Sequence, residues 1–324
     1  MRCYFNGTLL STVLPPVLGT EFVFGVLGNG LALWVFCFHM RPWKSSTVLL
    51  FNLAMADFFL NMALPFRAMY YISNIKWKFG HAMCNICLFM LALNRSGSTL
   101  FLMAIAVDRY MRVVHPHHPI NSLSITKAMW GALAMWLLTI SLTVHVFHLQ
   151  HFNTTRCESF MVDTEMHHNL NWHKFEFLLV FYVPLLVVLY CTFTIIGHLR
   201  RRQLSQQAKI RKALWFIIVV AVLFTICYLP SNIAQLLIWI QTKQLASKLP
   251  DSEVCSALED LTIVFYITIS LTYLNSVLDP VVYYFSSPIF KNICRKVFHL
   301  SQTDTGESTE NKTRETGSQS LSQL

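Results

Sequence analysis

Charged residues are scarce in this chain of 324 residues. Asp, Glu, Lys and Arg together make up only 13% of it, whereas hydrophobic residues make up 54%. A soluble globular domain usually carries about 25% charged residues. The scarcity therefore argues against a soluble protein and makes a membrane protein the first class to consider.

Patterns that would carry catalysis are missing as well. The sequence contains no Gly-rich phosphate loop. An intramembrane hydrolase would need paired catalytic groups at matching depth, and a secondary transporter would need inverted repeats with broken helices. We find neither pattern. We therefore expect neither an enzyme nor a resident cofactor, and a secondary transporter stays as a less favoured alternative.

Seven apolar stretches are each long enough to cross a membrane, because a spanning helix needs roughly 20 mainly apolar residues. They cover residues 17–40, 47–72, 82–107, 127–149, 173–199, 213–240 and 260–285. This pattern predicts an all-α membrane protein with a seven-transmembrane helix bundle over 17–285. No cleavable signal peptide is recognisable in residues 1–16, so the first span is expected to insert as its own signal.

Two shorter segments follow the predicted bundle. In residues 286–300, Phe290 and Ile293 share one helix face and Lys291 lies opposite, which predicts a short amphipathic eighth helix on the inner membrane surface. Residues 301–324 are polar and lack aromatic side chains, so we expect a disordered cytoplasmic tail. Its Ser and Thr residues suit phosphorylation.

The distribution of basic residues predicts the orientation in the membrane. Of the 25 Lys and Arg residues, sixteen fall on one side of the spans, eight on the other, and Arg95 within a span. The N-terminus (1–16) is therefore expected outside and the C-terminus in the cytoplasm, at the plasma membrane. The basic inner surface suits anionic lipid heads and cytosolic proteins, whereas nucleic acid is a poor partner for charges spread over membrane loops. Two glycosylation sequons, at Asn6 and Asn153, fall on the outer side.

Cysteines and histidines gather at the predicted outer end. Four of the nine cysteines lie there, an even number in an oxidising compartment, which favours disulfide bonds without fixing their pairing. Six histidines also lie there, but a zinc site would need close convergence. Solvated loop histidines are the favoured interpretation, so no metal site is expected. The histidines are His145, His148, His151, His167, His168 and His173.

Several polar residues lie inside the spans, where polar groups are costly and are functional candidates by default. Two are carboxylates, and two carboxylates in hydrocarbon need a cation or a shared proton. We expect a small cavity for an allosteric sodium ion or water, with a static hydrogen-bonded cluster as the alternative. The expected cavity residues are Asn29, Asp57, Ser98, Asn275 and Asp279, with Ser276 beside them.

Arg95 lies in the apolar stretch FMLALNRSGSTLF, residues 89–101. At 1.5 Å rise per residue it lies about 16 Å from Cys84 and about 21 Å from Arg109, in the outer half of the membrane. A guanidinium matches a carboxylate bidentately, so a ligand carboxylate is the favoured partner. Neutralisation by a protein carboxylate or by backbone carbonyls is the alternative. The expected apolar pocket walls are Phe66, Tyr70, Leu91, Leu178, Leu236, Phe265 and Tyr273.

Two further features concern movement of the bundle. Asp108-Arg109-Tyr110 closes the third span, and by itself this triplet indicates an interfacial ion pair. Prolines interrupt the second, fifth, sixth and seventh spans, and a proline frees a carbonyl and kinks its helix. These kinks are either passive features of shape or hinges. The prolines are Pro65, Pro184, Pro230 and Pro280.

Seven short motifs then occur in order along the whole chain. They are GN in the first span, LAxAD in the second, DRY after the third, Trp136 in the fourth, Pro184 in the fifth, FxxCYLP in the sixth and NSxxDPxxY in the seventh. Together they resemble the rhodopsin-like (class A) G-protein-coupled receptors. The segments LNRSGS, RYMRVVHPHH and TYLNSVLDPVVYYFSSP are further similar to the hydroxycarboxylic acid receptors and the related oxoeicosanoid receptor.

This resemblance implies a receptor for a small carboxylate or an oxidised fatty acid. It implies signalling mainly through inhibitory heterotrimeric G proteins, with arrestin and receptor kinases acting on the Ser/Thr tail. A class A receptor for another anionic ligand, nucleotide-like or peptide, is the alternative.

The resemblance also assigns roles to particular residues. Arg95 corresponds to the carboxylate anchor, Tyr273 to its supporting tyrosine and Ser159 to the serine after the loop-two cysteine; Leu91 and Gln235 complete the expected ligand-binding set. The switch toward the G protein corresponds to Asp108, Arg109, Tyr110 and Tyr283. The implied disulfides are Cys84–Cys157 and, from the remaining outer pair, Cys3–Cys255.

The chain also departs from the family's pattern. Hydroxycarboxylic acid receptors commonly carry a second Arg where this chain has Gln235, and an acidic residue where it has Val180. These changes predict a less polar pocket and favour an oxidised fatty acid over a short hydroxy acid. Span six also lacks an acid at its inner end that could hold Arg109, so Arg109 is expected to pair mainly with Asp108 at rest.

Overall fold

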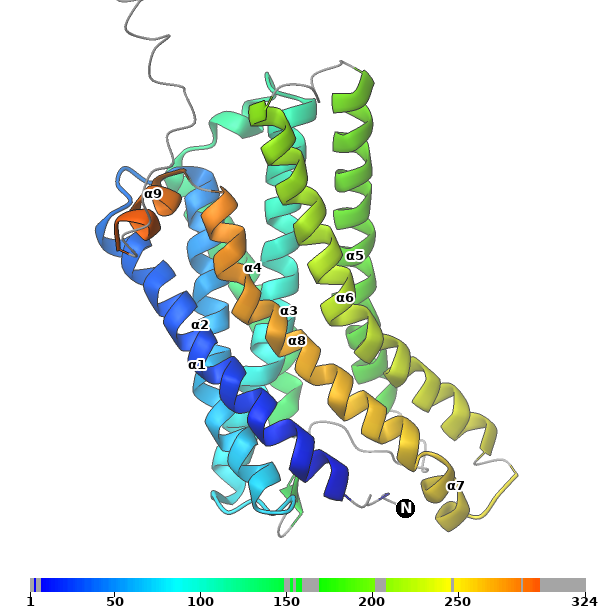
Figure 1. Ribbon diagram of the computed structural model, residues 1–324. Coiled ribbons are helices and arrows are strands. Elements are labelled where there is room, and N and C mark those ends of the chain that lie inside the picture. Colours follow the sequence, from blue (N-terminus) through cyan, green and yellow to red (C-terminus); the bar gives the residue numbers. More distant parts are fainter. Residues whose placement is uncertain are drawn as a thin grey trace, which may run out of the picture.

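The computed structural model describes residues 3, 7–148, 152–153, 156–158, 169–201, 208–245, 248–286 and 288–297. In this part of the chain the α-helices are α1 (Thr8–Phe38), α2 (Ser45–Ile72), α3 (Gly80–Val114), α4 (Ile125–Thr143), α5 (Asn169–Arg201), α6 (Ala208–Leu245), α7 (Asp251–Ala257), α8 (Glu259–Ser286) and α9 (Pro288–Val297) (Figure 1). Two 3-10 turns, Pro119–Ser122 and Val144–His148, follow α3 and α4.

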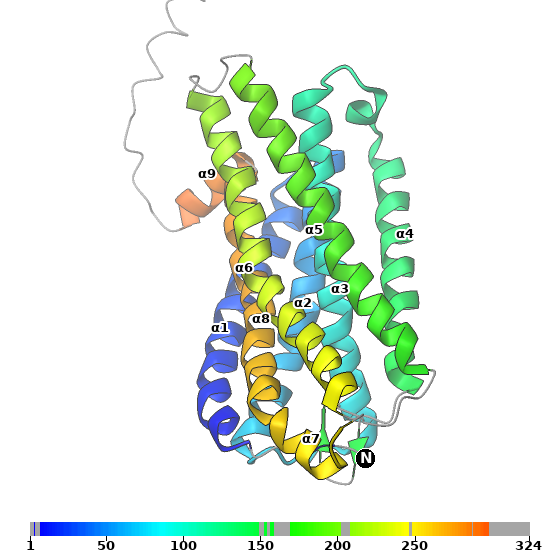
Figure 2. The same cartoon turned by 90° about the vertical axis from the view of Figure 1, so that its right-hand side faces the viewer.

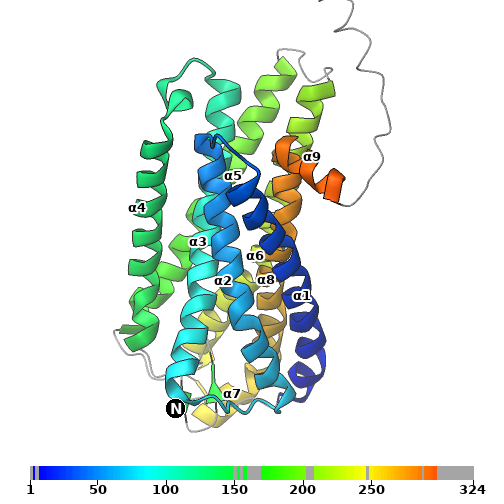
Figure 3. The same cartoon turned by 90° about the vertical axis from the view of Figure 1, so that its left-hand side faces the viewer.

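Seven helices of the described chain are long and apolar enough to cross a membrane: α1 to α6 and α8. They lie side by side as one bundle, with α4 at its edge (Figures 2 and 3). The prediction of an all-α bundle with seven spans and a short extra helix is confirmed. The chain is therefore a multi-pass membrane protein.

The first helix begins at Thr8, well before the predicted start at residue 17. Two prolines, Pro15 and Pro16, lie inside it and each removes a helix hydrogen bond. Leu10, Leu14 and Leu18, spaced by four residues, are all buried in the core. Burial of this apolar face outweighs the missing hydrogen bonds, because packing rather than propensity supplies most helix stability.

Both expected disulfides are present, at the same end of the bundle. Cys84 at the start of α3 is bonded to Cys157, and Cys3 is bonded to Cys255 in α7. Cys157 belongs to a two-stranded antiparallel hairpin, β1 (Phe152–Asn153) and β2 (Arg156–Cys157), which the all-α prediction did not include. We call this end of the bundle the disulfide end and the opposite one the α9 end.

The short helix α9 packs beside α1 and α8 (Figure 1). Its apolar residues Phe290 and Cys294 are buried, 2% and 6% exposed, in the same core cluster as Phe36 and Tyr283. The amphipathic pattern was therefore predicted correctly, but much of its apolar face packs on the bundle rather than on lipid. The predicted tail, residues 301–324, lies outside the described residues.

Candidate functional site

Asp57 lies at the centre of the bundle and is completely buried. One carboxylate oxygen accepts hydrogen bonds from the Asn94 amide at 3.1 Å and the Ser98 hydroxyl at 3.0 Å. The other accepts a hydrogen bond from the Tyr283 hydroxyl at 3.2 Å. Asn94 and Ser98 are one turn apart on α3 and Tyr283 belongs to α8. Asp57 thus joins three helices through one side chain.

The other expected cavity residues gather around the same point. The Asn275 amide donates to both oxygens of Asp279, at 3.3 and 3.5 Å. The Asn29 amide donates to the Ser276 carbonyl at 2.9 Å, and the Asn29 side-chain oxygen is buried without a partner. Asp57 and Asp279 lie within hydrogen-bonding reach of each other. The five predicted residues therefore converge.

Asn94 was missed by the sequence prediction, although its side chain forms hydrogen bonds to several members of this cluster. Its amide donates to the Ala56 carbonyl and to the hydroxyls of Ser98 and Ser276, at 3.1 to 3.2 Å, besides its bond to Asp57. The available signal was its position as a polar residue within the third span, directly before Arg95.

Arg95 joins α3 to α6. Its Nη2 donates a hydrogen bond to the side-chain oxygen of Asn232 at 3.1 Å. Asn232 lies two residues beyond Pro230, which is inside α6. The guanidinium therefore contacts the helix next to its proline, where α6 is best able to bend. Asn232 was not predicted, because a neutral amide gives a weaker signal than a charge.

Three residues expected around a ligand, Leu91, Tyr273 and Gln235, are buried. Leu91 and Tyr273 belong to the core cluster at the disulfide end. Gln235 lies one turn beyond Asn232 on α6 and is 1% exposed. The Gln235 side-chain oxygen and the Tyr228 hydroxyl are both buried without a hydrogen-bond partner. Two polar atoms of α6 near Arg95 are thus unsatisfied by protein groups.

Some of the expected residues cannot be located in the structure. Ser159 and Asn6 lie outside the described residues, and only the backbone of Asn153, in β1, is described. The side chain of Leu178 also lies outside the described part.

Arg67, one of the eight basic residues counted on the outer side, is a buried residue of α2. Its side chain is 3% exposed and lies inside the bundle near the disulfide end. It donates to the Cys157 carbonyl at 2.8 Å and to the Tyr71 hydroxyl at 3.0 Å, and lies over the ring of Tyr70, 5.0 Å from its centroid. Arg67 thus holds β2, and with it the Cys84–Cys157 disulfide, against α2.

Glu158 follows directly after this disulfide. Its carboxylate accepts a hydrogen bond from Arg156 at 3.3 Å. Burial raises the pKa of Glu158, while the nearby charges of Arg156 and Arg67 lower it. Both residues of the ion pair line a small pocket, open in part to solvent, together with Tyr70, Tyr71 and Tyr266. Acid, base and phenol groups therefore meet at the mouth of the bundle.

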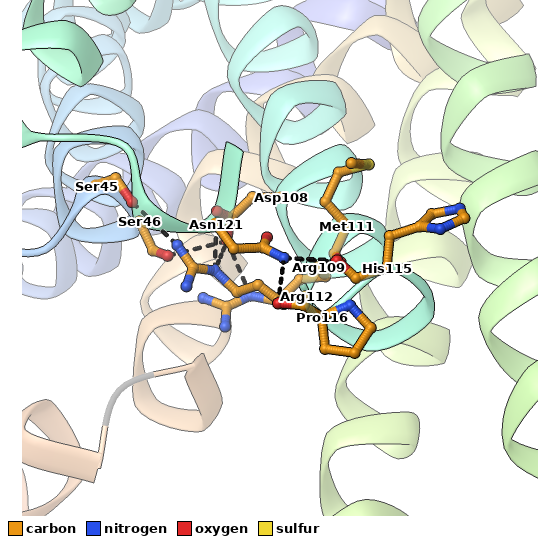
Figure 4. A network of polar contacts seen from close by, with 9 residues as sticks. All are labelled: Ser45, Ser46, Asp108, Arg109, Met111, Arg112, His115, Pro116 and Asn121. Atoms are coloured by element: carbon orange, nitrogen blue, oxygen red, sulfur yellow. Dashed lines mark hydrogen bonds and ion pairs between the residues drawn. The ribbon is translucent and has the colours of Figure 1, made fainter. Parts of the chain in front are cut away.

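At the α9 end, Asp108 is held mainly by Arg112 (Figure 4). The Arg112 Nε lies 3.0 Å from each oxygen of Asp108, and Ser46 donates to the same carboxylate at 2.9 Å. Arg109 is 3.9 Å from Asp108, and its Nε has no hydrogen-bond partner. The expected pairing of Arg109 with Asp108 is present, but Arg112 holds Asp108 more closely, because side chains four residues apart share a helix face and adjacent ones do not.

The network extends to the neighbouring helix and loop (Figure 4). Arg112 also donates to the Ser45 hydroxyl at 3.0 Å, at the start of α2. The Asn121 amide donates to three carbonyls at the end of α3, those of Met111, His115 and Pro116. Of the expected switch residues, Asp108, Arg109 and Tyr110 lie here, whereas Tyr283 is bonded to Asp57.

Comparison with known proteins agrees with this architecture. The model of the family described as 7 transmembrane receptor (rhodopsin family) matches residues 28–283. Human hydroxycarboxylic acid receptor 2 is 46% identical over 96% of this chain and 85% of its own length. Human oxoeicosanoid receptor 1 is 39% identical over 93% of this chain and 76% of its own length. The human 12-(S)-hydroxy-5,8,10,14-eicosatetraenoic acid receptor is 38% identical, over 92% of each. The chain therefore belongs to the rhodopsin family of seven-transmembrane receptors.

Proposed function

We propose that the protein is a plasma-membrane receptor that is activated by a carboxylate ligand and signals mainly through inhibitory heterotrimeric G proteins. The observation that carries this proposal is the contact between Arg95 of α3 and Asn232 beside the proline of α6. The names of its similar relatives refer to hydroxycarboxylic acids and to oxidised C20 acids. A carboxylate is the group that these ligands share and that a guanidinium binds bidentately.

The ligand also carries a hydroxyl group near its carboxylate. The Gln235 side-chain oxygen is buried without a partner among the described residues, and Gln235 is one turn from the residue that binds Arg95. An amide oxygen accepts hydrogen bonds and cannot donate them. A ligand hydroxyl would satisfy it, whereas an oxo group would not. This favours a hydroxy acid, of either short or long chain, over an oxo acid.

Activation follows as a shift between two helix arrangements. The ligand carboxylate takes over donors of Arg95 and so replaces the contact with Asn232. The segment of α6 beyond Pro230 is then free to swing. Arg109, which is held weakly by Asp108 at 3.9 Å, is available at the α9 end for a G-protein helix between α3, α5 and α6. The excess of basic residues at this end supports its placement in the cytoplasm, where arrestin and receptor kinases would act on the tail.

We further propose that the Asp57 cavity holds an allosteric sodium ion. Its donor set of carboxylate, hydroxyl and amide oxygens suits a hard cation, and the Asn29 side-chain oxygen lacks a partner. Sodium is expected to lower agonist affinity by favouring the resting arrangement. Agonist binding measured in sodium and in potassium chloride tests this effect, which Asp57→Asn should abolish. Equal sodium sensitivity of the variant would count against the site.

The central experiment measures ligand-dependent nucleotide exchange on purified G proteins. The panel contains lactate-like, ketone-body and nicotinate-like acids and oxidised C20 fatty acids, each beside its methyl ester. The active acids should stimulate nucleotide exchange, and their methyl esters should not. Arg95→Ala should weaken agonist binding by about 2–5 kcal/mol, roughly 30-fold or more in Kd, and Arg95→Lys should weaken it less because it keeps the charge.

Lys78→Ala is the matched control, because it removes an exposed cation at the disulfide end. Gln235→Leu should remove the preference for a hydroxy acid over its deoxy analogue, which is worth about 1–3 kcal/mol. Equal potency of acid and ester, or unchanged potency of Arg95→Ala at normal surface expression, would exclude the proposed anchor.

A further inference from the structure

Glu21 is an acidic residue inside a membrane-spanning helix that the proposed activation does not use. It lies in α1 and is 5% exposed. Leu14, Leu18, Gly25 and Asn29 are buried with it, so it faces the bundle rather than lipid. Its Oε2 is buried without a hydrogen-bond partner, and no ion pair of the described residues includes it.

Asn61 of α2 presents a second unsatisfied oxygen to the same face of α1. Its amide nitrogen donates to the Asp57 carbonyl at 2.8 Å. Because a carbonyl only accepts, this bond fixes which way the amide points, and its oxygen faces α1. A Cβ placed on Gly25 would overlap that oxygen. Gly25 is one helical turn, about 6 Å, from Glu21.

Among the residues that the structure describes, none forms an ion pair that would balance a carboxylate at Glu21. Its electrostatic contacts are the phenol of Tyr273 on α8 and the thiol of Cys227 on α6, both neutral at neutral pH. On α2 the charged groups are Asp57 and Arg67. Arg67 lies six residues beyond Asn61, about 9 Å along the axis, and donates to Cys157 and Tyr71.

Two buried acceptors one turn apart therefore lack a donor. An ionised carboxylate without a partner is costly inside a membrane, and so is an unsatisfied amide oxygen. A single proton on the carboxylate would remove both costs, because the neutral acid can donate a hydrogen bond to the amide oxygen. We propose that Glu21 is a proton-binding site, which takes up a proton from water and, as a carboxylic acid, donates a hydrogen bond to the Asn61 side-chain oxygen.

This bond would couple the proton to the centre of the bundle. The same Asn61 amide donates to the backbone of Asp57, whose side chain joins α2, α3 and α8. Loss of the proton would leave a carboxylate facing an amide oxygen, and two acceptors repel. Proton release thus loosens α1 from α2 beside the Asp57 cavity, so Glu21 links receptor conformation to proton activity.

Infrared spectroscopy of the full-length receptor in lipid nanodiscs without ligand tests the proposal directly. A protonated carboxyl group has a carbonyl stretching band that an ionised carboxylate lacks. The expected result is a band that is lost in Glu21→Gln and kept in Asp57→Asn and in Asp279→Asn. Asn61→Ala should shift this band, because the acid then loses its acceptor. Identical spectra of wild type and Glu21→Gln would overturn the proposal.

Two controls separate a proton from other donors. The band should be the same in sodium and in potassium chloride; a band that appears only when sodium is removed would assign the site to the cation and overturn the proposal. Glu21→Gln keeps a donor group, so its thermal unfolding midpoint should match wild type, and Glu21→Ala should fall below both. An equal fall of the thermal unfolding midpoint in Glu21→Gln and Glu21→Ala would also contradict the proposed hydrogen bond. No ligand is needed, so the outcome is independent of the role of Arg95.

Discussion

Arg67 and Arg95 both have side chains within the helix bundle, and their partners give them different roles. Arg67 is buried beside aromatic rings and donates hydrogen bonds to the Cys157 carbonyl and the Tyr71 hydroxyl. Arg95 is half-buried and is bonded to a neutral amide. The first arrangement stabilises a loop, because buried donors there meet fixed acceptors. The second leaves an exchangeable contact, as a ligand anchor requires.

Glu158 provides a pH dependence at the same scale. Burial raises its folded-state pKa above the unfolded value of about 4.3. At a pH between the unfolded-state and the folded-state pKa of Glu158, the folded state binds more protons than the unfolded state. The free energy of unfolding therefore falls as the pH rises through the folded-state pKa. Acidification from neutral pH toward the unfolded value should therefore raise the thermal unfolding midpoint.

Thermal unfolding of the detergent-solubilised receptor across this range measures the effect. Glu158→Gln should flatten the rise, whereas Glu253→Gln, at an exposed acid of α7, should keep it. An equal rise in wild type and Glu158→Gln would show that another group is responsible.

The sequence located most of the charged side chains that matter, but only some of their neutral partners. Asp57 and Asp279 stand out in apolar spans because a charge there is costly. Asn94 and Asn232 escaped prediction, since an amide is only moderately costly and its role depends on which helix faces it. The burial of Arg67 was not predicted, because a count of basic residues indicates only the side of the membrane near which a charge lies.

At the scale of elements, the helical period of α3 determines which of its side chains meet in the polar network at the α9 end. Arg112 lies four residues after Asp108 and takes the carboxylate that would otherwise hold Arg109. We expect Arg112→Met to leave Arg109 as the ion-pair partner of Asp108 and so to favour the resting state. Because partly exposed pairs are worth about 0.2–1 kcal/mol, basal and agonist-stimulated exchange should fall by up to roughly fivefold.

Nucleotide exchange at matched receptor concentration measures this change. The double variant Arg112→Met with Asp108→Asn should recover activity, because Arg109 then has no carboxylate to bind. Wild-type exchange in the single variant, or no recovery in the double variant, would argue against competition between the two arginines.

Hydropathy predicted that seven helices exist but not where they end. The third span was expected to stop at residue 107, whereas α3 continues to Val114. Polar residues such as Arg112 and Asn121 extend and close that helix through side-chain contacts, and these contacts depend on neighbouring elements. The hairpin β1–β2 was missed for the same reason, because the disulfide to α3 and the hydrogen bond from Arg67 of α2 hold so short a pair of strands in place.

At the scale of the whole molecule, covalent cross-links are confined to one end among the described residues. Cys84–Cys157 joins α3 to β2, close to Arg67, while Cys3–Cys255 joins the N-terminus to α7. Removal of the first pair by Cys84→Ser with Cys157→Ser should release β2 from the mouth of the bundle and abolish agonist binding. Removal of the second by Cys3→Ser with Cys255→Ser should lower thermal stability with little effect on affinity.

Ligand binding and thermal unfolding of the two double variants, at equal surface expression, provide the test. Loss of binding in both, or in neither, would contradict the separate roles assigned to the two bonds.

The position of Cys294 has a consequence for lipid modification. Its sulfur lies on the side of α9 that packs against the bundle, and the side chain is 6% exposed. Burial also raises the pKa of its thiol, which lowers the fraction of reactive thiolate. A fatty acyl chain joined to this sulfur as a thioester would have no room in the packed state. Docking of α9 on the bundle and acylation of Cys294 therefore exclude each other, and an acyltransferase would modify only receptors whose α9 has detached.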